Sequence, residues 1–234
     1  MQPSASTVVL PVYNEASTVA GVLDAVRAVH AGPIVVVDDG SDDGTAAVLS
    51  TRDDVQVVTH VHNLGYGRSL IDGFAAALAS GAEVVVTMDC DGQHEPAHIP
   101  GFFEALKAHD IVSGSRYLPA SEAVGRPPRG RQAINERVTA LINATTGWSL
   151  TDAFCGFKAY RADALRAMQL SEPGYAMPLQ LWAEAYRAGL SVAELPVARI
   201  YFDGDRSFGQ DLDDPDRRYA YYLRVWHDAL EGSR

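Results

Sequence analysis

Acidic and amide side chains that could bind a metal ion follow three short hydrophobic runs of the sequence. The runs lead into residues 11–15, into residues 38–41 and into the segment Asp89-Cys90-Asp91-Gly92-Gln93. In the last segment Asp89 and Asp91 are two residues apart, and Gln93 is two residues further on. Carboxylate and amide oxygens at this spacing suit Mg²⁺ or Mn²⁺, which keep coordination positions open for a diphosphate. One Asp-x-Asp pair alone would more often be a strand end that faces solvent, but three such ends together favour a metal site.

A cluster of arginines is the second group of candidate residues. The chain of 234 residues has 19 basic and 30 acidic side chains, a net charge of −11. Between residues 113 and 137, however, there are five Arg and two Glu, a local charge of +3. The planar guanidinium group binds phosphate through two parallel hydrogen bonds, whereas the Lys ammonium acts as a point charge. The cluster therefore predicts a phosphate-binding loop, with a solvated basic loop as the alternative.

Hydrophobic periodicity indicates the elements that must position these residues. Short β-branched runs predict buried strands at residues 7–12, 33–37, 55–59, 83–88 and 110–113. Residues 19–29 and 68–79 have the apolar spacing or the Ala content of helices. Strands that alternate with helices indicate an α/β fold with a mainly parallel sheet, covered on both faces. Such sheets bind ligands beyond the carboxyl ends of their strands, where the acidic segments lie.

The second half of the sequence begins with a Pro/Gly-rich loop over residues 116–130. Beyond it we expect a helix at 132–145, a strand at 156–160, a helix at 178–188, an extended pair at 191–202 and a terminal helix at 217–230. We therefore expect a single domain over residues 1–234. Its nucleotide-binding half, 1–115, is joined without a linker to an acceptor-binding half, 116–234.

Composition excludes several classes of protein. With 47% hydrophobic and 21% charged residues the chain is globular rather than disordered, and a pI of about 5.0 argues against a nucleic-acid partner. Two cysteines are too few for a disulfide framework or a zinc site, which favours a reducing compartment. No signal-peptide pattern is visible, and no stretch approaches 18 apolar residues. We therefore expect a cytoplasmic protein that does not span a membrane.

Several motifs together resemble the inverting family 2 glycosyltransferases, which have the GT-A fold. The matching segments are residues 9–15, 36–45, 63–67, 88–96, 114–117, 135, 152, 155–158 and 194–197. Residues 89–96 and 114–117 are similar, more narrowly, to polyprenyl-phosphate sugar transferases, the group of dolichyl-phosphate mannose synthase. The resemblance implies a Rossmann-like, mainly parallel sheet flanked by helices, with a small extension on the acceptor side.

On the donor side, the resemblance implies a site for a nucleotide-activated hexose of the GDP-mannose or UDP-glucose type. The residues that would line its nucleoside pocket are Pro11, Tyr13, Glu15, Asp39, Ser41 and Asp89. Asp89, Asp91 and Gln93 would hold Mg²⁺ or Mn²⁺ against the diphosphate, which gives Asp91 a catalytic role. Gly65 and Gly67 fit either a close approach of the backbone to the nucleotide or a simple loop-to-helix turn.

On the acceptor side, the resemblance implies that Arg116, with Arg129 or Arg131, grips phosphate during catalysis. Arg206 would close over the phosphates, and Asp152 belongs with Arg129 and Arg206 among the acceptor-binding residues. Transfer to a hydroxyl normally requires a carboxylate that takes the proton. Many family members carry a Glu-Asp pair in the second half for this purpose, whereas residues 174–180 contain no acid here. A phosphate acceptor is already anionic, so we expect polyprenyl phosphate as the acceptor.

Three alternatives remain open at this point. The first is a glycosyltransferase with a soluble hydroxyl acceptor and Asp152 or Glu184 as its base. The second is a sugar-phosphate nucleotidyltransferase, and the third is a non-catalytic nucleotide-sugar-binding protein.

Peripheral contact with the inner face of a membrane is also open. The apolar side chains of one stripe, which lies beside the arginine cluster, are Ala133, Ile134, Val138, Leu141 and Ile142. This stripe fits either an interfacial helix or a helix packed in the core.

Overall fold

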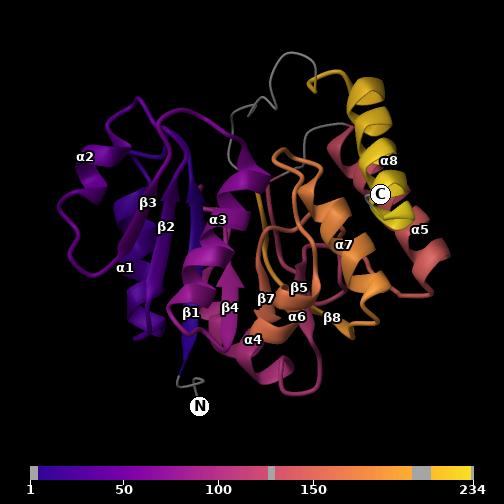
Figure 1. The fold of residues 1–234 in the computed structure, drawn as a ribbon, viewed down its shortest axis with the longest axis horizontal. Coiled ribbons are helices and arrows are strands. Elements are labelled where there is room, and N and C mark those ends of the chain that lie inside the picture. The colour runs from indigo at the N-terminus through magenta and orange to yellow at the C-terminus, as the bar shows by residue number, and fades with distance from the viewer. Residues whose placement is uncertain (1–4, 126–129, 202–211, 233–234) are drawn as a thin grey trace.

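The computed structural model describes residues 5–125, 130–201 and 212–232, and a seven-stranded sheet forms its centre (Figure 1). The strands lie in the order β3-β2-β1-β4-β7-β5-β8. Their bounds in that order are Gln56–Thr59, Ile34–Asp38, Ser6–Val12, Val84–Thr87, Lys158–Arg161, Ile111–Ser115 and Val192–Pro196. All neighbouring strands are parallel except β7, which is antiparallel to both β4 and β5. The expected α/β fold with a mainly parallel sheet is confirmed.

The central strand β1 explains why three distant polar segments meet. It pairs in parallel with β2 on one side and with β4 on the other. Val12, at the end of β1, lies beside Asp38, at the end of β2, and Val9 lies beside Thr87, at the end of β4. The segments that follow these three strands therefore leave the same edge of the sheet side by side, as the sequence predicted.

Helices cover both faces of the sheet. Their bounds are α1 Val19–Val29, α2 Thr45–Leu49, α3 Tyr66–Ala79, α4 Ile99–Ala105, α5 Arg131–Thr146, α6 Ala162–Ala167, α7 Met177–Arg187 and α8 Pro215–Glu231, with a short 3₁₀ turn at Pro96–His98. Successive side chains of a strand point to opposite faces. Val8 and Leu10 accordingly belong to the core cluster that includes residues of α1, α2 and α4, whereas Val9 belongs to the cluster that includes residues of α3, α5, α7 and α8. Strands buried on both faces are continuous apolar runs, which is why the β-branched runs identified them.

The second half of the chain completes the sheet and adds a helical layer. Strand β7 lies between β4 and β5, so elements of both halves share one sheet. Helix α8 packs against α7 and α5, and all three lie at the right of Figure 1. A separate small sheet pairs β6, Ala123–Val124, with β9, Arg199–Ile200.

Helix α5 decides between the two explanations of the apolar stripe at residues 133–142. Ile134, Val138 and Ile142 are buried in the core, Leu141 packs against it, and only Ala133 is exposed. Of the two alternatives, the stripe therefore fits the helix packed in the core rather than the interfacial helix. Among the described residues no helix is both long and apolar enough to cross a membrane.

Candidate functional site

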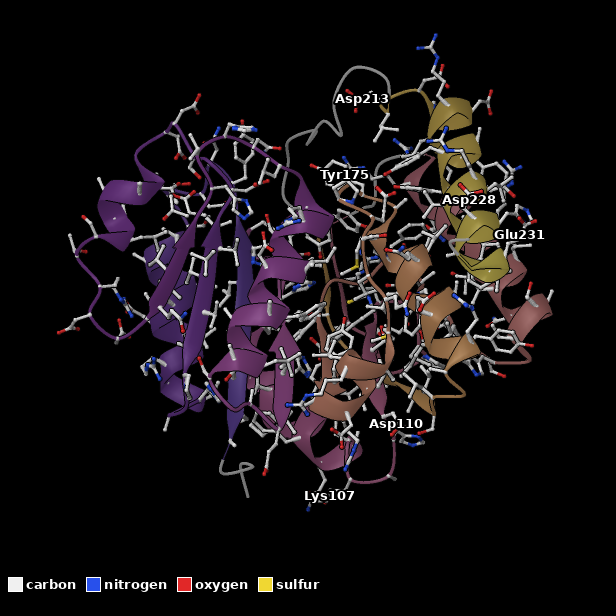
Figure 2. All side chains as sticks on the ribbon, viewed as in Figure 1. Lys107, Asp110, Tyr175, Asp213, Asp228 and Glu231 are labelled. Carbon is white, nitrogen blue, oxygen red and sulfur yellow. The ribbon has the colours of Figure 1, made fainter. Side chains whose placement is uncertain are left out.

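A cleft of about 620 Å³ opens where the carboxyl ends of β1, β2 and β4 meet the second half of the chain. Its first wall comes from the segments after these strands, and its second wall from α5, α7, α8 and the segment after β5. Tyr175 belongs to the second wall, and Figure 2 shows it toward the upper edge of the molecule. Lys107 and Asp110 lie at the opposite edge in the same view.

Asp89 lines the cleft, and its carboxylate and its backbone amide are both held by neighbouring residues. Tyr66, in the first turn of α3, donates its hydroxyl proton to Asp89 Oδ1 over 3.0 Å. The backbone amide of Asp89 donates to His94 Nδ1 over 3.0 Å. A Cβ atom on Gly156 would lie 2.5 Å from Asp89 Oδ2, so the carboxylate occupies space that only a glycine leaves. The orientation of the Asp89 carboxylate is therefore set by Tyr66 and Gly156, which lie far from it in the sequence.

Asp91 and Gln93 also line the cleft. Asp91 Oδ1 accepts a hydrogen bond of 2.9 Å from the amide of Gln93, which folds the segment into a tight turn. In the described parts of the chain, no group of three or more His, Cys, Asp and Glu side chains is gathered for a metal ion. Mg²⁺ is commonly held by one or two carboxylates together with substrate phosphates, so Asp89 and Asp91 fit such an ion beside a diphosphate. The donor set suits a cation shared with the substrate rather than a closed structural site.

The turn after β1 also belongs to the first wall of the cleft. Pro11, Tyr13 and Glu15 line the cleft. Between them Asn14 adopts a left-handed backbone conformation with φ of 57°, and its backbone amide donates a hydrogen bond to Ser41 Oγ over 2.9 Å. Ser41 therefore positions the turn and does not itself line the cleft.

Asp39 lines the cleft but is almost fully buried, because its carboxylate binds the loop before α3. Its two oxygens accept hydrogen bonds from the amides of Leu64, at 2.8 Å, and Gly65, at 2.9 Å. His60 Nδ1 lies 2.6 Å from Asp39 Oδ1, and His60 Nε2 lies 3.0 Å from Asp72 Oδ2. Sequence reasoning missed His60 and Asp72, since neither belongs to a recognisable motif.

Gly65 and Gly67 have a structural role that differs from the expected approach of a nucleotide. A Cβ atom on Gly65 would lie 2.4 Å from the carbonyl oxygen of Pro173, and one on Gly67 would lie 2.2 Å from that of Glu172. The same Pro173 oxygen accepts a hydrogen bond from the amide of Arg68. The two glycines thus let the segment before α7 pack on the first turn of α3, although Gly65 also lines the cleft.

Arg116 lines the second wall and is held by a buried carboxylate. Its Nε and Nη2 donate to Asp152 Oδ2 and Oδ1 over 2.6 and 2.9 Å. Asn135 Nδ2 donates to Asp152 Oδ1 over 2.8 Å. Burial would raise the pKa of Asp152, but the Arg116 guanidinium and these hydrogen bonds hold it below its ordinary value. Asp152 has no exposed surface and does not line the cleft, so the structure gives it the role of positioning Arg116 rather than touching an acceptor.

Glu194, in β8, binds the backbone of the segment that carries Asp152. Its carboxylate accepts hydrogen bonds from the amides of Thr151, at 2.8 Å, and Asp152, at 3.0 Å. Burial raises the pKa of Glu194, against the opposing effect of the bonds from Thr151. Glu194 thus holds the backbone of Asp152, and Asp152 in turn holds the Arg116 side chain.

Two further cations line the second wall, Arg131 at the start of α5 and Arg218 in the first turn of α8. Arg131 was expected from the sequence, whereas Arg218 was missed. Its signal is present, because Arg218 shares a helix face with the buried Tyr222, Val225 and Ala229. Arg129 and Arg206, also expected at phosphate, lie outside the described residues.

Comparison with known proteins places this geometry in a family. Residues 7–168 match the family model described as Glycosyl transferase family 2. The chain is 34% identical over 200 residues to an undecaprenyl-phosphate mannosyltransferase of Micrococcus luteus, which covers 82% of each chain. It is 33% identical over 202 residues to a polyprenol monophosphomannose synthase of Mycolicibacterium smegmatis, which covers 81% of this chain and 75% of the relative.

A solved structure supports the same assignment at the level of the fold. This is glucosyl-3-phosphoglycerate synthase from Mycobacterium tuberculosis, in complex with Mn²⁺, uridine diphosphate and phosphoglyceric acid. The TM-score is 0.72 at 20% sequence identity, over 98% of this chain and 80% of the other. The chain therefore belongs to glycosyl transferase family 2, and it is a glycosyltransferase with the GT-A fold.

Proposed function

We propose that this glycosyltransferase transfers a hexose, with inversion, from a nucleotide-sugar donor to a polyprenyl phosphate. Residues 1–115 bind the donor, of the GDP-mannose or UDP-glucose type, and residues 116–234 bind the acceptor. The names of the two relatives support this acceptor, since one is an undecaprenyl-phosphate mannosyltransferase and the other a polyprenol monophosphomannose synthase. The alternatives of a nucleotidyltransferase and of a non-catalytic binding protein are wrong, because the family is one of glycosyltransferases.

The observation that carries the proposal is the division of charge between the two walls of the cleft. All acidic side chains that line it within the described residues, Glu15, Asp39, Asp89 and Asp91, come from the first half. The described lining residues of the second half include Arg116, Arg131 and Arg218 but no carboxylate. A hydroxyl acceptor requires a base, whereas a phosphate acceptor requires cations. The second wall therefore supports a phosphate acceptor.

The two carboxylates considered as bases for a hydroxyl acceptor are both buried and do not line the cleft. Asp152 is bound to Arg116 as described, and Glu184 accepts hydrogen bonds from the amide of Gln169 at 3.0 Å and from Arg187 Nη1 at 2.5 Å. With their oxygens engaged inside the protein, neither is placed to take a proton from a sugar hydroxyl. This arrangement disfavours the soluble hydroxyl acceptor.

We further propose that Asp89, Asp91 and Gln93 hold Mg²⁺ or Mn²⁺ against the donor diphosphate. When bound, such a cation neutralises the charge that develops on the leaving nucleoside diphosphate. The Mn²⁺ and uridine diphosphate in the related structure support this assignment. Asp89 is oriented by Tyr66 and Gly156, so its carboxylate is set before the donor arrives. Pro11, Tyr13, Glu15 and Asp39 form the nucleoside end of the same wall.

The direct test is transfer by the purified protein. With radiolabelled nucleotide sugar and Mn²⁺, we expect label to enter the organic phase with undecaprenyl phosphate and not with undecaprenol, which lacks the phosphate. Transfer to soluble saccharides without transfer to undecaprenyl phosphate would contradict the proposed acceptor. Thermal-shift measurements with GDP-mannose and UDP-glucose then identify the donor, because a ligand that binds the folded state raises its melting temperature.

Asp91→Ala tests the metal assignment. We expect transfer to be abolished with little change in melting temperature, because a side chain at a strand end contributes little packing. Asp228→Ala, which removes an exposed acid of α8, is the matched control. Full activity of the Asp91 variant, or of the wild type in excess chelator, would show that no metal is held there.

We also propose that the protein meets a membrane surface when it collects this acceptor. Sedimentation with liposomes that contain undecaprenyl phosphate measures the contact, with plain phosphatidylcholine liposomes as the reference. Equal sedimentation with both would contradict acceptor-dependent contact.

A further inference from the structure

Arg218 is a buried cation at the cleft that lies outside the segments in which the sequence resembles the family. Its side chain lines the cleft although only 6% of the residue is exposed. Nη1 donates to the carbonyl oxygen of Leu212 over 2.7 Å, which fixes the guanidinium plane at the start of α8. A guanidinium desolvated to this extent and turned to a cleft is suited to an anionic ligand.

Tyr222 lies one helical turn after Arg218 and also lines the cleft. Arg218, Arg131 and Tyr222 all line the cleft, and both arginines act electrostatically on the Tyr222 hydroxyl. Burial raises the pKa of Tyr222 to about 12, against the opposing effect of the two arginines. The hydroxyl therefore keeps its proton at neutral pH and can donate a hydrogen bond. Packing of α8 against α5 brings these donors together.

The charge of this neighbourhood differs from that around Arg116. The buried Asp152 accepts two hydrogen bonds from the Arg116 guanidinium and largely offsets its charge. A carboxylate that interacts electrostatically with Arg218, that of Asp214 at the start of α8, is exposed and does not line the cleft. The cations that line the cleft on its α5–α8 side are Arg131 and Arg218.

We propose that Arg218, together with Arg131 and Tyr222, binds the phosphate of the acceptor on the α5–α8 side of the cleft. This inference rests on the proposed function. The donor diphosphate and the acceptor phosphate offer the same chemistry to an arginine, but the donor is expected against Asp89 and Asp91 on the opposite wall. A second phosphate brought to the sugar needs cations of its own, which α5 and α8 supply.

The test compares Arg218→Met and Arg218→Lys with Arg217→Met, which removes the exposed neighbouring arginine of the same helix. Loss of one charge-assisted hydrogen bond to phosphate corresponds to about a tenfold or larger rise in KM for undecaprenyl phosphate. We expect that rise in Arg218→Met, a smaller rise in Arg218→Lys, and no change in Arg217→Met. KM for the nucleotide sugar should stay unchanged in all three. A rise confined to KM for the donor, or no rise at all, would overturn the inference.

Binding without turnover separates this inference from the proposed function. Calorimetric titration with farnesyl phosphate, and with farnesol as the phosphate-free control, reports the phosphate contact directly. If the wild type binds neither compound and transfers nothing to undecaprenyl phosphate, the proposed function fails. If the wild type binds farnesyl phosphate and Arg218→Met binds it equally well, only the role of Arg218 fails.

Tyr222→Phe removes one hydroxyl and keeps the packed ring, so it remains informative if Arg218→Met does not fold. We expect a severalfold weaker affinity for farnesyl phosphate at an unchanged melting temperature. Unchanged affinity in both Tyr222→Phe and Arg218→Lys would overturn the inference.

Discussion

The carboxylate of Asp89 occupies a space that exists only because residue 156 has no side chain. Tyr66, which also lines the cleft, donates a hydrogen bond to Oδ1 of the same carboxylate. Gly156 and Tyr66 together decide where the Asp89 oxygens lie. Groups that orient a metal ligand affect metal affinity nearly as strongly as the ligand does.

Gly156→Ala should displace Asp89 and weaken the binding of metal and nucleotide. The added methyl would lie 2.5 Å from Asp89 Oδ2, which is too close for both atoms to keep their positions. We expect the Mn²⁺ affinity in the presence of nucleoside diphosphate to fall about tenfold to a hundredfold, as for other changes around a ligand. Titration calorimetry measures this Mn²⁺ affinity. Gly21→Ala, where a Cβ meets no atom within 4 Å, is the control. Equal Mn²⁺ affinity in the two variants would show that Asp89 is not a ligand.

Tyr66→Phe removes the hydroxyl group that donates to Asp89. Burial raises the pKa of Tyr66 well above its ordinary value, so the hydroxyl is a permanent donor. We expect the Mn²⁺ concentration that gives half-maximal transfer to rise about tenfold. At saturating Mn²⁺ we expect kcat to be largely recovered. Tyr186→Phe, at an exposed position of α7, should leave this Mn²⁺ concentration unchanged. A lowered kcat that Mn²⁺ does not restore would assign Tyr66 a role beyond Asp89.

At this scale the sequence predicted the residues whose position follows from a strand end. Asp89 and Asp91 come just after β4, so a parallel sheet suffices to bring them to the cleft. Gly156 and Tyr66 act on Asp89 only because β7 lies beside β4 and α3 packs over the sheet. No local pattern contains that information.

At the scale of elements, Asp152 joins three parts of the second half. Its oxygens accept from Arg116, which follows β5, and from Asn135 of α5, while Glu194 of β8 holds the amide of Asp152. These hydrogen bonds compensate the cost of burying the Asp152 charge. Without the carboxylate, however, the donor groups would stay buried without a partner.

Asp152→Ala should therefore destabilise the protein strongly. Removal of one partner from a buried ion pair costs about 3–5 kcal/mol, because the other charge stays buried without compensation. Urea denaturation measures the change in the free energy of unfolding. Asp163→Ala breaks the exposed pair with Arg166 and should cost well under about 1 kcal/mol. Similar costs for the two variants would mean that Arg116 finds another partner.

The sequence located most elements to within one or two residues, but only where the pattern was long. Strand β4 was expected at 83–88 and spans Val84–Thr87, and α5 was expected at 132–145 and spans Arg131–Thr146. The short helices α2, α4 and α6 were missed, because five to seven residues hold too little periodicity. The antiparallel direction of β7 was also not predicted, since pairing direction depends on the whole sheet. The sequence does show Arg218 on the apolar face of α8, but only the docking of α8 brings that residue to the cleft.

At the scale of the whole molecule, His30 makes the stability depend on pH. Burial lowers the pKa of His30 below its ordinary value of 6.5. The unfolded chain therefore binds this proton at a higher pH than the folded protein. The stability associated with neutral His30 is present above pH 6.5 and is lost as the pH falls below that value.

His30→Gln should remove this part of the pH dependence. We expect the melting temperature of the wild type to fall between about pH 7.5 and about pH 5.5, and to fall less in the variant. His227→Gln, at an exposed position of α8, should behave as the wild type. An identical pH profile for His30→Gln and the wild type would contradict the assignment.

The position of β7 has a consequence for how the chain is made and how it can be recombined. Strand β5 finds its neighbours in β7 and β8, so during synthesis it has no place in the sheet until residues 158–161 have left the ribosome. Until then β4 keeps an open edge, which is a site for wrong pairing. A chimera cut at residue 115 would exchange β7 together with the second half, and with it Gly156, which shapes the space for Asp89. If the second half binds the acceptor as proposed, its specificity is therefore not exchangeable at that cut without also changing the surroundings that orient Asp89.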